Sequence, residues 1–388
     1  MRLLSFLVSR KDIFMSNALA TFEVPTFESV ERLRQCVAGE EPCDLYPRDG
    51  TERLSQLEGR FAELVGVRDD QLVLCASGMA AVTGTVDSLL TRDSVLAFPH
   101  SAYSRTLGYA EWLRKAGIKV VQLDSGDPQD VERVVTAHRP TVILSETVGN
   151  GPDTPVLDIG ELYDACDRAD LQPTFVLDNT LPLSTGLDTQ TLLGDDRKTI
   201  FVESATKAYA FNKELAGLVY SADQALLEGV RRQRQTDGFG PNVAGVEALH
   251  SLIPSTAEFD ERNARVFKNS RSLAYAAFKA QGDGTVFTTS HPDLPDHPGL
   301  LLSRGTLLDG SSPVFYLNCG LDVDQYWLAD QLWQSEEVRH HADLGQSFGF
   351  DRVRILPNAT YPTVRISAGA TTDVDAFGCA LKRTLERL

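Results

Sequence analysis

Residues 202–207, VESATK, place a lysine directly after two hydroxyl-bearing residues at the end of an apolar, strand-like run. A lysine in a desolvated or cationic site loses its proton readily and can attack a carbonyl. The hydroxyls of Ser204 and Thr206 could bind a phosphate beside it. Because Lys207 could also be a solubilising charge at a strand tip, its role depends on what the other strand ends supply.

Three other strand ends carry polar or aromatic residues. CASGMAAV places Ser77, Gly78 and Met79 before a helix, where backbone N–H groups and the helix dipole can hold a phosphate, although such turns are common without a ligand. TFVLDNT ends a buried strand with Asp178, whose carboxylate needs a donor or a cation such as a pyridinium nitrogen. A capping or turn role explains Asp178 equally well. Tyr103, in HSAYSRT, could stack on a flat ring or pack as an ordinary residue.

The order of these features is more informative than any one of them. A phosphate turn, an aromatic residue, an aspartate and a Ser-x-Thr-Lys segment follow one another along the chain. Together they describe a site for pyridoxal 5′-phosphate (PLP), a cofactor that proteins hold through a lysine and tune through a carboxylate at the pyridine nitrogen.

The chain resembles the Cys/Met-metabolism family of fold-type-I PLP enzymes, which includes cystathionine γ-synthase, cystathionine lyases and methionine γ-lyase. The resemblance covers roughly residues 44–388. It is carried, in family order, by YPRDG (46–50), LEGRFAELVG, SGMAA (77–81), YSRT (103–106), ETVGNG (146–151), LDNT (177–180), SATK (204–207), SFG (347–349) and VRISAG (364–369).

The resemblance implies three catalytic residues. Lys207 would hold the cofactor covalently and then act as acid and base once substrate displaces it. Asp178 would keep the pyridine nitrogen protonated, and Tyr103 would stack on the ring and assist proton transfer.

The resemblance also implies the binding residues and the assembly. Arg365 would pair with the substrate α-carboxylate in a two-pronged contact, with Ser347 and Glu146 also at the substrate. Tyr46 and Arg48 would reach the phosphate of a neighbouring subunit, so we expect a homo-oligomer, either a dimer or a homotetramer built as a dimer of dimers. The cofactor-binding residues of the same subunit would be Ser77, Gly78, Met79, Tyr103, Asn150, Asp178, Ser204, Thr206 and Lys207.

The elements that position these residues alternate along the chain. Short apolar runs separated by amphipathic segments indicate an α/β fold with a mostly parallel seven-stranded sheet covered on both faces, whose ligands gather at the carboxyl ends of the strands. The expected strands are DQLVLCAS, DSVLAFP, KVVQLD, PTVILSET, PTFVLDNT, KTIFVES and LAGLVYS. PVFYLNCG, PTVRISAG and a closing helix predict a smaller C-terminal α+β domain. We therefore divide the chain into an extension and arm that serves the neighbouring subunit's site (1–60), a PLP-binding large domain (61–245) and a small domain (246–388).

Composition limits the partners and the compartment. A formal charge of −17 over 388 residues argues against binding nucleic acid or anionic membranes. The six cysteines are scattered, with no metal-ligand spacing, so we expect reduced thiols, no metal and a cytoplasmic location. We assign no function to residues 1–14.

Three departures from the family pattern affect the substrate. The Asn-Pro-Thr that usually follows the Tyr-x-Arg segment is missing, FNKELAG replaces the family's Gly-His-Ser-Asp after the lysine, and the stretch between Ser347 and Arg365 is short. These departures lie where substrate is chosen, so the acceptor pocket should differ from one for cysteine. We expect a PLP-dependent lyase or transferase acting at Cγ or Cβ of an L-amino acid in specialised metabolism, and among these reactions we favour γ-elimination.

Other functions remain alternatives. They are γ-replacement as in cystathionine γ-synthase, and an aminotransferase or aldolase on the same fold, for which His100 could stack on the ring. A member that binds ligand without turnover is disfavoured, because it has little use for both Lys207 and Asp178. A dinucleotide-dependent dehydrogenase is disfavoured because no GxGxxG follows a first strand.

Overall fold

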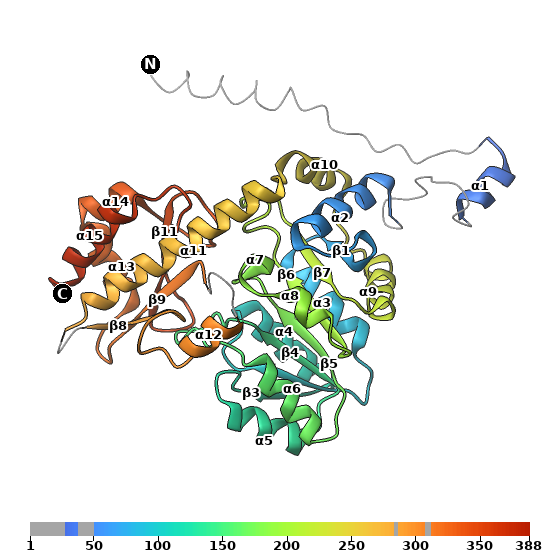
Figure 1. Ribbon diagram of the computed structural model, residues 1–388, viewed down its shortest axis with the longest axis horizontal. Coiled ribbons are helices and arrows are strands. Elements are labelled where there is room, and N and C mark those ends of the chain that lie inside the picture. The colour runs from blue at the N-terminus through green and yellow to red at the C-terminus, as the bar shows by residue number, and fades with distance from the viewer. Residues whose placement is uncertain (1–27, 38–49, 283–285, 307–311) are drawn as a thin grey trace.

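The computed structural model describes residues 28–37, 50–282, 286–306 and 312–388. Tyr46 and Arg48 lie outside the described residues. The described chain forms two lobes, each built on one sheet, and the long helix α11 (Thr256–Lys279) packs against elements of both (Figure 1).

The larger lobe contains a seven-stranded sheet in the order β1-β7-β6-β5-β4-β2-β3. Only β7 runs antiparallel to its neighbours, so the sheet is mostly parallel. Each apolar run singled out in the sequence forms one of these strands, which confirms the predicted fold class. The strands are β1 (Leu72–Cys75), β2 (Val95–Pro99), β3 (Lys119–Leu123), β4 (Val142–Glu146), β5 (Thr174–Asp178), β6 (Thr199–Glu203) and β7 (Gly217–Tyr220).

Alternate residues of each strand point to opposite faces of this sheet, and helices cover both faces. In β1, Val73 and Cys75 join one apolar cluster, and Leu72 and Leu74 join the other. The first cluster is completed by α3 (Gly78–Leu89), α4 (Ser104–Lys115) and α9 (Gln224–Asp237). The second is completed mainly by α2 (Glu52–Val65), α5 (Pro128–His138) and α6 (Ile159–Arg168).

The smaller lobe contains a five-stranded sheet in the order β10-β11-β12-β9-β8. The sequence predicted β9, β12 and the closing helix α15, but not β8, β10 or β11. The strands are β8 (Phe287–Ser290), β9 (Val314–Cys319), β10 (Ala342–Leu344), β11 (Val353–Pro357) and β12 (Thr363–Ser367). Besides α11, the helices of this lobe are α12 (Leu300–Thr306), α13 (Gln325–Gln334), α14 (Glu336–His341) and α15 (Val374–Leu385).

Helix α2 runs through the boundary expected between residues 60 and 61. Leu57 and Phe61 lie on either side of that boundary, and both are fully buried in the core of the larger lobe. The core therefore begins at least as early as α2. The remaining short elements are α1 (Val30–Val37), η2 (Asp69–Gln71), α7 (Leu183–Gly186), α8 (Thr189–Leu193) and α10 (Val243–Leu252). Across the described ranges, no helix has the length and apolar character needed to cross a membrane.

Candidate active site

The carboxyl ends of five parallel strands bring the predicted residues to one edge of the large sheet. Ser77 follows β1, Tyr103 follows β2, Glu146 ends β4, Asp178 ends β5 and Lys207 follows β6. β1 shares the direction of the others because both β1 and β6 run antiparallel to β7. Ligand sites of parallel α/β sheets form at this edge.

Lys207 is half-buried, and its amine contacts a segment of the small lobe. Its Nζ donates to Ser347 Oγ at 2.7 Å and lies 5.7 Å from the centroid of the Phe348 ring. Burial, together with the positive charge of Arg365, lowers the pKa of Lys207 from 10.5 to about 8. Within the described chain no carboxylate pairs with Lys207, so the amine is available both as a nucleophile and as a base.

The turn after β1 is built for close backbone approach. Ser77 caps α3 by accepting a hydrogen bond from Ala80 N at 3.1 Å. A Cβ on Gly78 would lie 2.6 Å from Ser204 Cβ, so only glycine lets the turn approach the end of β6 this closely. Met79 occupies the first turn of α3. The turn therefore offers the N-terminus of a twelve-residue helix beside the Ser204 side chain, an arrangement suited to a phosphate.

Thr206 is placed differently from the sequence-based expectation. Its buried hydroxyl donates to Ala216 O at 3.2 Å and accepts from Ala216 N at 3.0 Å. A hydroxyl has one proton to donate. A phosphate contact by Thr206 stays a prediction and would require this hydroxyl to turn away from Ala216.

Asp178 is a carboxylate without a cationic partner among the described residues. Its Oδ1 accepts from the backbone N–H of Thr180 at 3.0 Å. Glu146 stands opposite it in the register of β4 and β5. Burial raises the pKa of Asp178. A pyridinium nitrogen would supply the missing positive charge.

Glu146 is buried, and both of its oxygens are used by backbone groups. Oε1 accepts from Tyr103 N at 2.6 Å and Oε2 accepts from Asn150 N at 2.7 Å. Burial, and then the charge of Asp178, raise the pKa of Glu146. Glu146 thus connects the backbones of two residues expected at the cofactor ring, and its contact with the substrate stays a prediction. Tyr103 itself remains 41% exposed.

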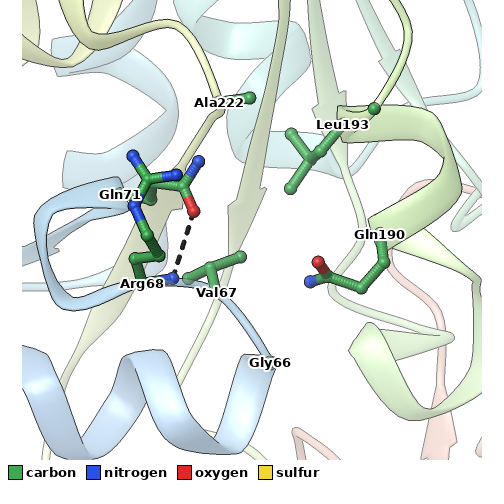
Figure 2. Close-up of a pocket in the computed structure, with 8 residues that line it drawn as sticks. Gly66, Val67, Arg68, Gln71, Gln190, Leu193 and Ala222 are labelled. Carbon is green, nitrogen blue, oxygen red and sulfur yellow. Dashed lines mark hydrogen bonds between the residues drawn. The ribbon is translucent and has the colours of Figure 1, made fainter.

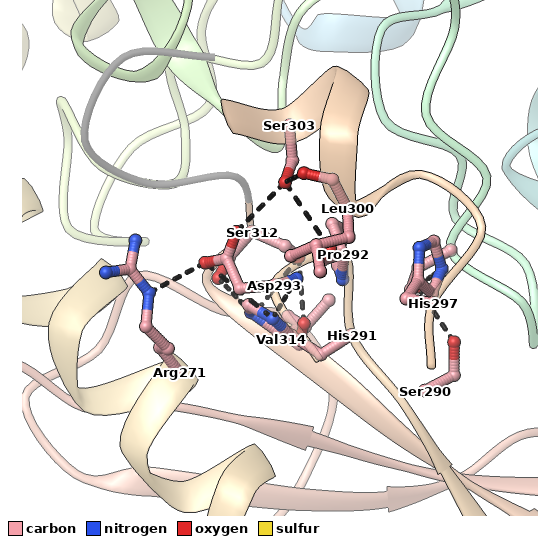
Figure 3. Close-up of polar contacts among 11 residues, drawn as sticks. Arg271, Ser290, His291, Pro292, Asp293, His297, Leu300, Ser303, Ser312 and Val314 are labelled. Atoms are coloured by element: carbon pink, nitrogen blue, oxygen red, sulfur yellow. Dashed lines mark hydrogen bonds and ion pairs between the residues drawn. The ribbon is translucent and has the colours of Figure 1, made fainter. Parts of the chain in front are cut away.

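The loop that carries Asn150 is fastened to the small lobe. The hydroxyl of Tyr316, on β9, donates to Asn150 Oδ1 at 2.6 Å. Further along the loop, His297 Nε2 donates to Asp153 O at 2.6 Å, and the hydroxyls of Thr154 and Ser290 lie 2.9 Å apart. Figure 3 shows His297 beside Ser290 in this network. The relative placement of the two lobes therefore fixes the position of Asn150.

A second part of this network is internal to the small lobe. The Asp293 carboxylate accepts from Arg271 Nε at 2.9 Å and from Ser303 Oγ at 3.2 Å (Figure 3). Burial lowers the pKa of His291 to about 4, so this side chain is neutral. Its Nδ1 accepts from Asp293 N, and its Nε2 contacts Ser312 O. These groups satisfy one another and hold the segment beyond β8.

Arg365, on β12, has one guanidinium N–H without a hydrogen-bond partner among the described residues. Its Nη2 donates to Ser347 O at 3.3 Å, while its Nε is buried without a hydrogen-bond partner within the described residues. A buried, unsatisfied guanidinium N–H is costly, and a substrate carboxylate could satisfy it. This geometry suits the carboxylate-binding role expected for Arg365.

Sequence reasoning did not identify Asn212 or Tyr316 as site residues. Asn212 contacts Ser347 from the segment after Lys207, and Tyr316 contacts Asn150 from the other lobe. An asparagine in a segment that departs from the family pattern was the only sequence signal for Asn212. No local signal marked Tyr316, since its partner lies 166 residues away.

Beneath the strand ends lies a buried polar network. Glu203, at the end of β6, accepts from Asn179 Nδ2 at 2.9 Å, Tyr220 OH at 2.7 Å and Tyr209 OH at 2.5 Å. Burial raises the pKa of Glu203 to about 7. Because Asn179 directly follows Asp178, this network holds the ends of β5 and β6 in place.

A separate cavity of about 480 Å³ lies between the turn that follows α2 and helix α8. It is lined by Gly66, Val67, Arg68, Gln71, Gln190, Leu193, Gly194 and Ala222 (Figure 2 labels all but Gly194), and none of these is a residue of the site. Its cation, Arg68, pairs with Asp70 at 3.0 Å. The cavity contributes no side chain to the candidate active site.

The site residues fit PLP on three observations: a glycine turn that admits no Cβ, a carboxylate without a cation, and a lysine with a lowered pKa. The fold and these residues define a PLP-dependent enzyme of fold type I.

Comparisons with known proteins give the family. The model of the family described as "Cys/Met metabolism PLP-dependent enzyme" matches residues 12–323. The L-methionine gamma-lyase of Pseudomonas putida is 30% identical over 386 residues, covering 95% of this chain and 90% of that protein. The L-methionine gamma-lyase of Porphyromonas gingivalis is 23% identical over 380 residues, covering 93% of this chain and 90% of that protein.

Structural comparison agrees on the fold. The crystal structure of cystathionine gamma synthase from Xanthomonas oryzae pv. oryzae, in complex with aminoacrylate and cysteine, superposes with a TM-score of 0.77 at 18% identity. The match covers 95% of this chain and 92% of that one. The chain belongs to the Cys/Met-metabolism family of PLP-dependent enzymes, and the predicted family, fold and cofactor are confirmed.

Proposed function

We propose that this enzyme catalyses γ-elimination from an L-amino acid that carries a leaving group on Cγ. For a substrate whose carbon chain ends at Cγ, the amino acid and one water give 2-oxobutyrate, ammonium and the protonated leaving group. Two C–H bonds must break, at Cα and at Cβ, before the bond from Cγ to the leaving group can break.

The observation that carries this proposal is the position of Lys207 after β6, where its Nζ contacts Ser347 Oγ at 2.7 Å. A pKa of about 8 leaves part of the amine unprotonated near neutral pH, as a base requires. When bound, PLP supplies an electron sink for the electron pair left at Cα. The amine of Lys207 would take the proton from Cα and then move a proton at Cβ. Its contact with Ser347 holds the amine in one place during both transfers.

The remaining side chains bind and orient. Asp178 balances the positive charge of the pyridine nitrogen, and Arg365 binds the α-carboxylate through the guanidinium N–H that lacks a protein partner. Tyr103 stacks on the ring and assists proton transfer. Asn150 and Ser347 position the ring and the substrate.

The phosphate is held from two subunits. Ser77, Gly78, Met79 and Ser204 bind it from one side, supported by the close approach of Gly78 to Ser204. Tyr46 and Arg48 of the partner subunit bind it from the other side, as the family resemblance implies. The catalytic unit is thus a homo-oligomer, either a dimer or a dimer of dimers.

We also propose a cytoplasmic location. The support is the state of the thiols, because Cys75, Cys166, Cys319 and Cys379 are all free in the described structure.

Elimination is favoured over replacement because of the segment that follows Lys207. FNKELAG stands where the family resemblance leads us to expect Gly-His-Ser-Asp, and it includes the exposed Lys213 and Leu215. An altered acceptor pocket disfavours capture of the intermediate by a thiol such as cysteine. The family relationship to proteins named L-methionine gamma-lyase points the same way.

A product analysis tests the proposal. The PLP-loaded enzyme is given L-methionine or an O-acyl-L-homoserine, with and without cysteine. We expect a keto acid that lacks the γ-substituent, formed in equal amount to the leaving group and little affected by cysteine. A thioether product would indicate γ-replacement instead. A keto acid that keeps the γ-substituent and stops after one turnover would indicate transamination and refute elimination.

A further inference from the structure

Three residues around Lys207 adopt left-handed backbone conformations. Phe211 has φ 51°, Asn212 has φ 58° and Ser347 has φ 74°. Residues other than glycine enter this region at a cost, although asparagine does so more readily than most. Such conformations persist where the surrounding structure holds them, and they gather at functional sites. Their grouping beside Lys207 raises the question of what they hold in place.

They hold a short chain of hydrogen bonds that ends on the amine. Asn212 Nδ2 donates to Phe348 O at 2.7 Å, and Asn212 Oδ1 accepts from Ser347 Oγ at 2.7 Å. Ser347 Oγ in turn accepts from Lys207 Nζ at 2.7 Å. A carbonyl oxygen only accepts, so the contact with Phe348 O fixes which end of the Asn212 amide faces the serine. The single proton of the Ser347 hydroxyl therefore goes to Asn212, and its lone pairs face Lys207.

The backbone at both ends of this chain of hydrogen bonds is fixed as well. Asn212 N donates to Thr206 O at 2.7 Å. Ser347 O accepts from Arg365 Nη2 at 3.3 Å and from Ser367 Oγ at 3.2 Å. A Cβ on Gly349 would lie 2.9 Å from the carbonyl carbon of Lys207, so this segment packs directly on the lysine backbone. Neither Asn212 nor Ser347 can move without disturbing these contacts.

Few charged groups act on the amine. Among the described residues, Arg365, on β12, is the charged group that lowers the pKa of Lys207. Of the site carboxylates, Glu146 is occupied by two backbone N–H groups and Asp178 by Thr180 N. The hydroxyl of Ser347 is thus the polar group that contacts Lys207 directly.

We propose that Asn212 is a positioning residue, which turns the Ser347 hydroxyl so that its lone pairs hold Lys207 Nζ at the point of proton transfer. The inference rests on the proposed function in taking Lys207 as the group that moves the proton. The site needs a side chain that accepts from Ser347, donates to Phe348 O and tolerates a left-handed backbone. Asparagine combines all three properties.

Two variants of Asn212 separate its roles. Asn212→Gly keeps the left-handed backbone at low cost and removes both hydrogen bonds. The Ser347 hydroxyl is then free to donate to the neutral amine, which favours the unprotonated form. Asn212→Asp keeps the acceptor but loses the donor, and it places a negative charge beside Ser347, which favours the protonated form. The matched control is Asn269→Ala, because the Asn269 amide also donates to a backbone carbonyl, that of Gly369 at 2.8 Å, but away from the site.

The first measurement uses cofactor-free protein, so it needs no turnover. The rate at which acetic anhydride acylates Lys207 is followed against pH by peptide mass spectrometry, and its midpoint reports the pKa of the amine. For wild type we expect a midpoint near 8. We expect the midpoint to fall by about half a pH unit in Asn212→Gly and to rise by about one unit in Asn212→Asp. Asn269→Ala should match wild type.

A double-mutant cycle tests whether Asn212 acts through Ser347. Ser347→Gly alone should lower the midpoint as Asn212→Gly does, and combining the two should add no further shift. Additive shifts, or Asn212 variants with the wild-type midpoint, would overturn the proposal. If Asn212→Gly does not fold, Asn212→Asp and Ser347→Gly still give opposite expected shifts.

The second measurement uses PLP-loaded enzyme and exchange of the substrate α-proton with deuterated water. We expect Asn212→Gly to slow exchange about tenfold with KM little changed, because the base is misplaced rather than lost. Shifted midpoints without γ-elimination would support the role of Asn212 and refute the proposed function. Elimination with unshifted midpoints would support the proposed function and refute the role of Asn212.

Discussion

Replacing Lys207 with methionine should abolish turnover and, in the cofactor-free protein, change how stability depends on pH. Folding lowers the pKa of this lysine from 10.5 to about 8, because burial and Arg365 disfavour the charged form. Below about pH 8 the lysine is protonated in both the folded and the unfolded state, so the full cost of the buried charge is present. Between about 8 and 10.5 the folded protein releases the proton and the unfolded chain keeps it, so the folded state gains stability as pH rises.

The size of the effect follows from the shift. One pKa unit corresponds to about 1.4 kcal/mol, so full burial of the ammonium would cost about 3 kcal/mol. Solvent reaches the half-buried side chain and screens its charge, which reduces the expected effect to about 1–2 kcal/mol. Methionine has a similar length and carries no charge, and Ser347 keeps Asn212 as a partner after the substitution.

The assay is denaturant unfolding of wild-type and Lys207→Met apoprotein at about pH 7 and at about pH 9.5. Because other groups titrate alike in both proteins, the difference between their unfolding free energies isolates Lys207. We expect wild type to gain about 1–2 kcal/mol relative to the variant between the two pH values. A difference that does not change with pH would show that the amine is not desolvated, and the reasoning about its reactivity would fail.

Three further substitutions test the supporting contacts. Glu146→Gln leaves one of the two backbone N–H groups facing an amide donor, so we expect the free energy of unfolding to fall by about 1–3 kcal/mol relative to wild type near pH 5. At higher pH the loss should be smaller, because the charged Glu146 destabilises the wild-type protein there. Equal thermal stability of the two proteins at both pH values would contradict this. Gly78→Ala forces a Cβ to within 2.6 Å of Ser204 Cβ, so PLP affinity in equilibrium dialysis should fall at least about tenfold, and wild-type affinity would refute the close approach. Tyr316→Phe removes the 2.6 Å bond to Asn150, and we expect kcat to fall about tenfold with Tm changed little; an unchanged kcat would remove Asn150 from the site.

The large lobe could be predicted from sequence because its signals are local. Most strands are short apolar runs, as in Val142–Glu146, whose five residues are all buried, whereas the edge strand β3 is only partly buried. Parallel strands bring their carboxyl ends to one edge, so the positions of Asp178 and Lys207 followed from strand order. The motifs of the family resemblance then supplied the cofactor.

The parts that sequence did not predict depend on contacts between distant segments. Ser347 was expected at the substrate, but its hydroxyl contacts Lys207 across 140 residues and Asn212 across 135. Tyr316 reads as an ordinary buried strand residue until its hydroxyl is placed against Asn150. The Thr206 hydroxyl bonds the backbone of Ala216, directly before β7, a contact that no local pattern encodes, and its role at the phosphate stays a prediction.

The most direct test of the account asks which lysine carries the cofactor. The PLP-loaded protein is reduced with borohydride, digested, and its peptides are mapped by mass spectrometry, with the exposed Lys213 as an internal comparison six residues away. We expect the phosphopyridoxyl group on Lys207 alone, with loss of the visible absorbance of the bound cofactor on reduction. A modification on Lys213 or another lysine, with Lys207 unmodified, would contradict the assignment of the site.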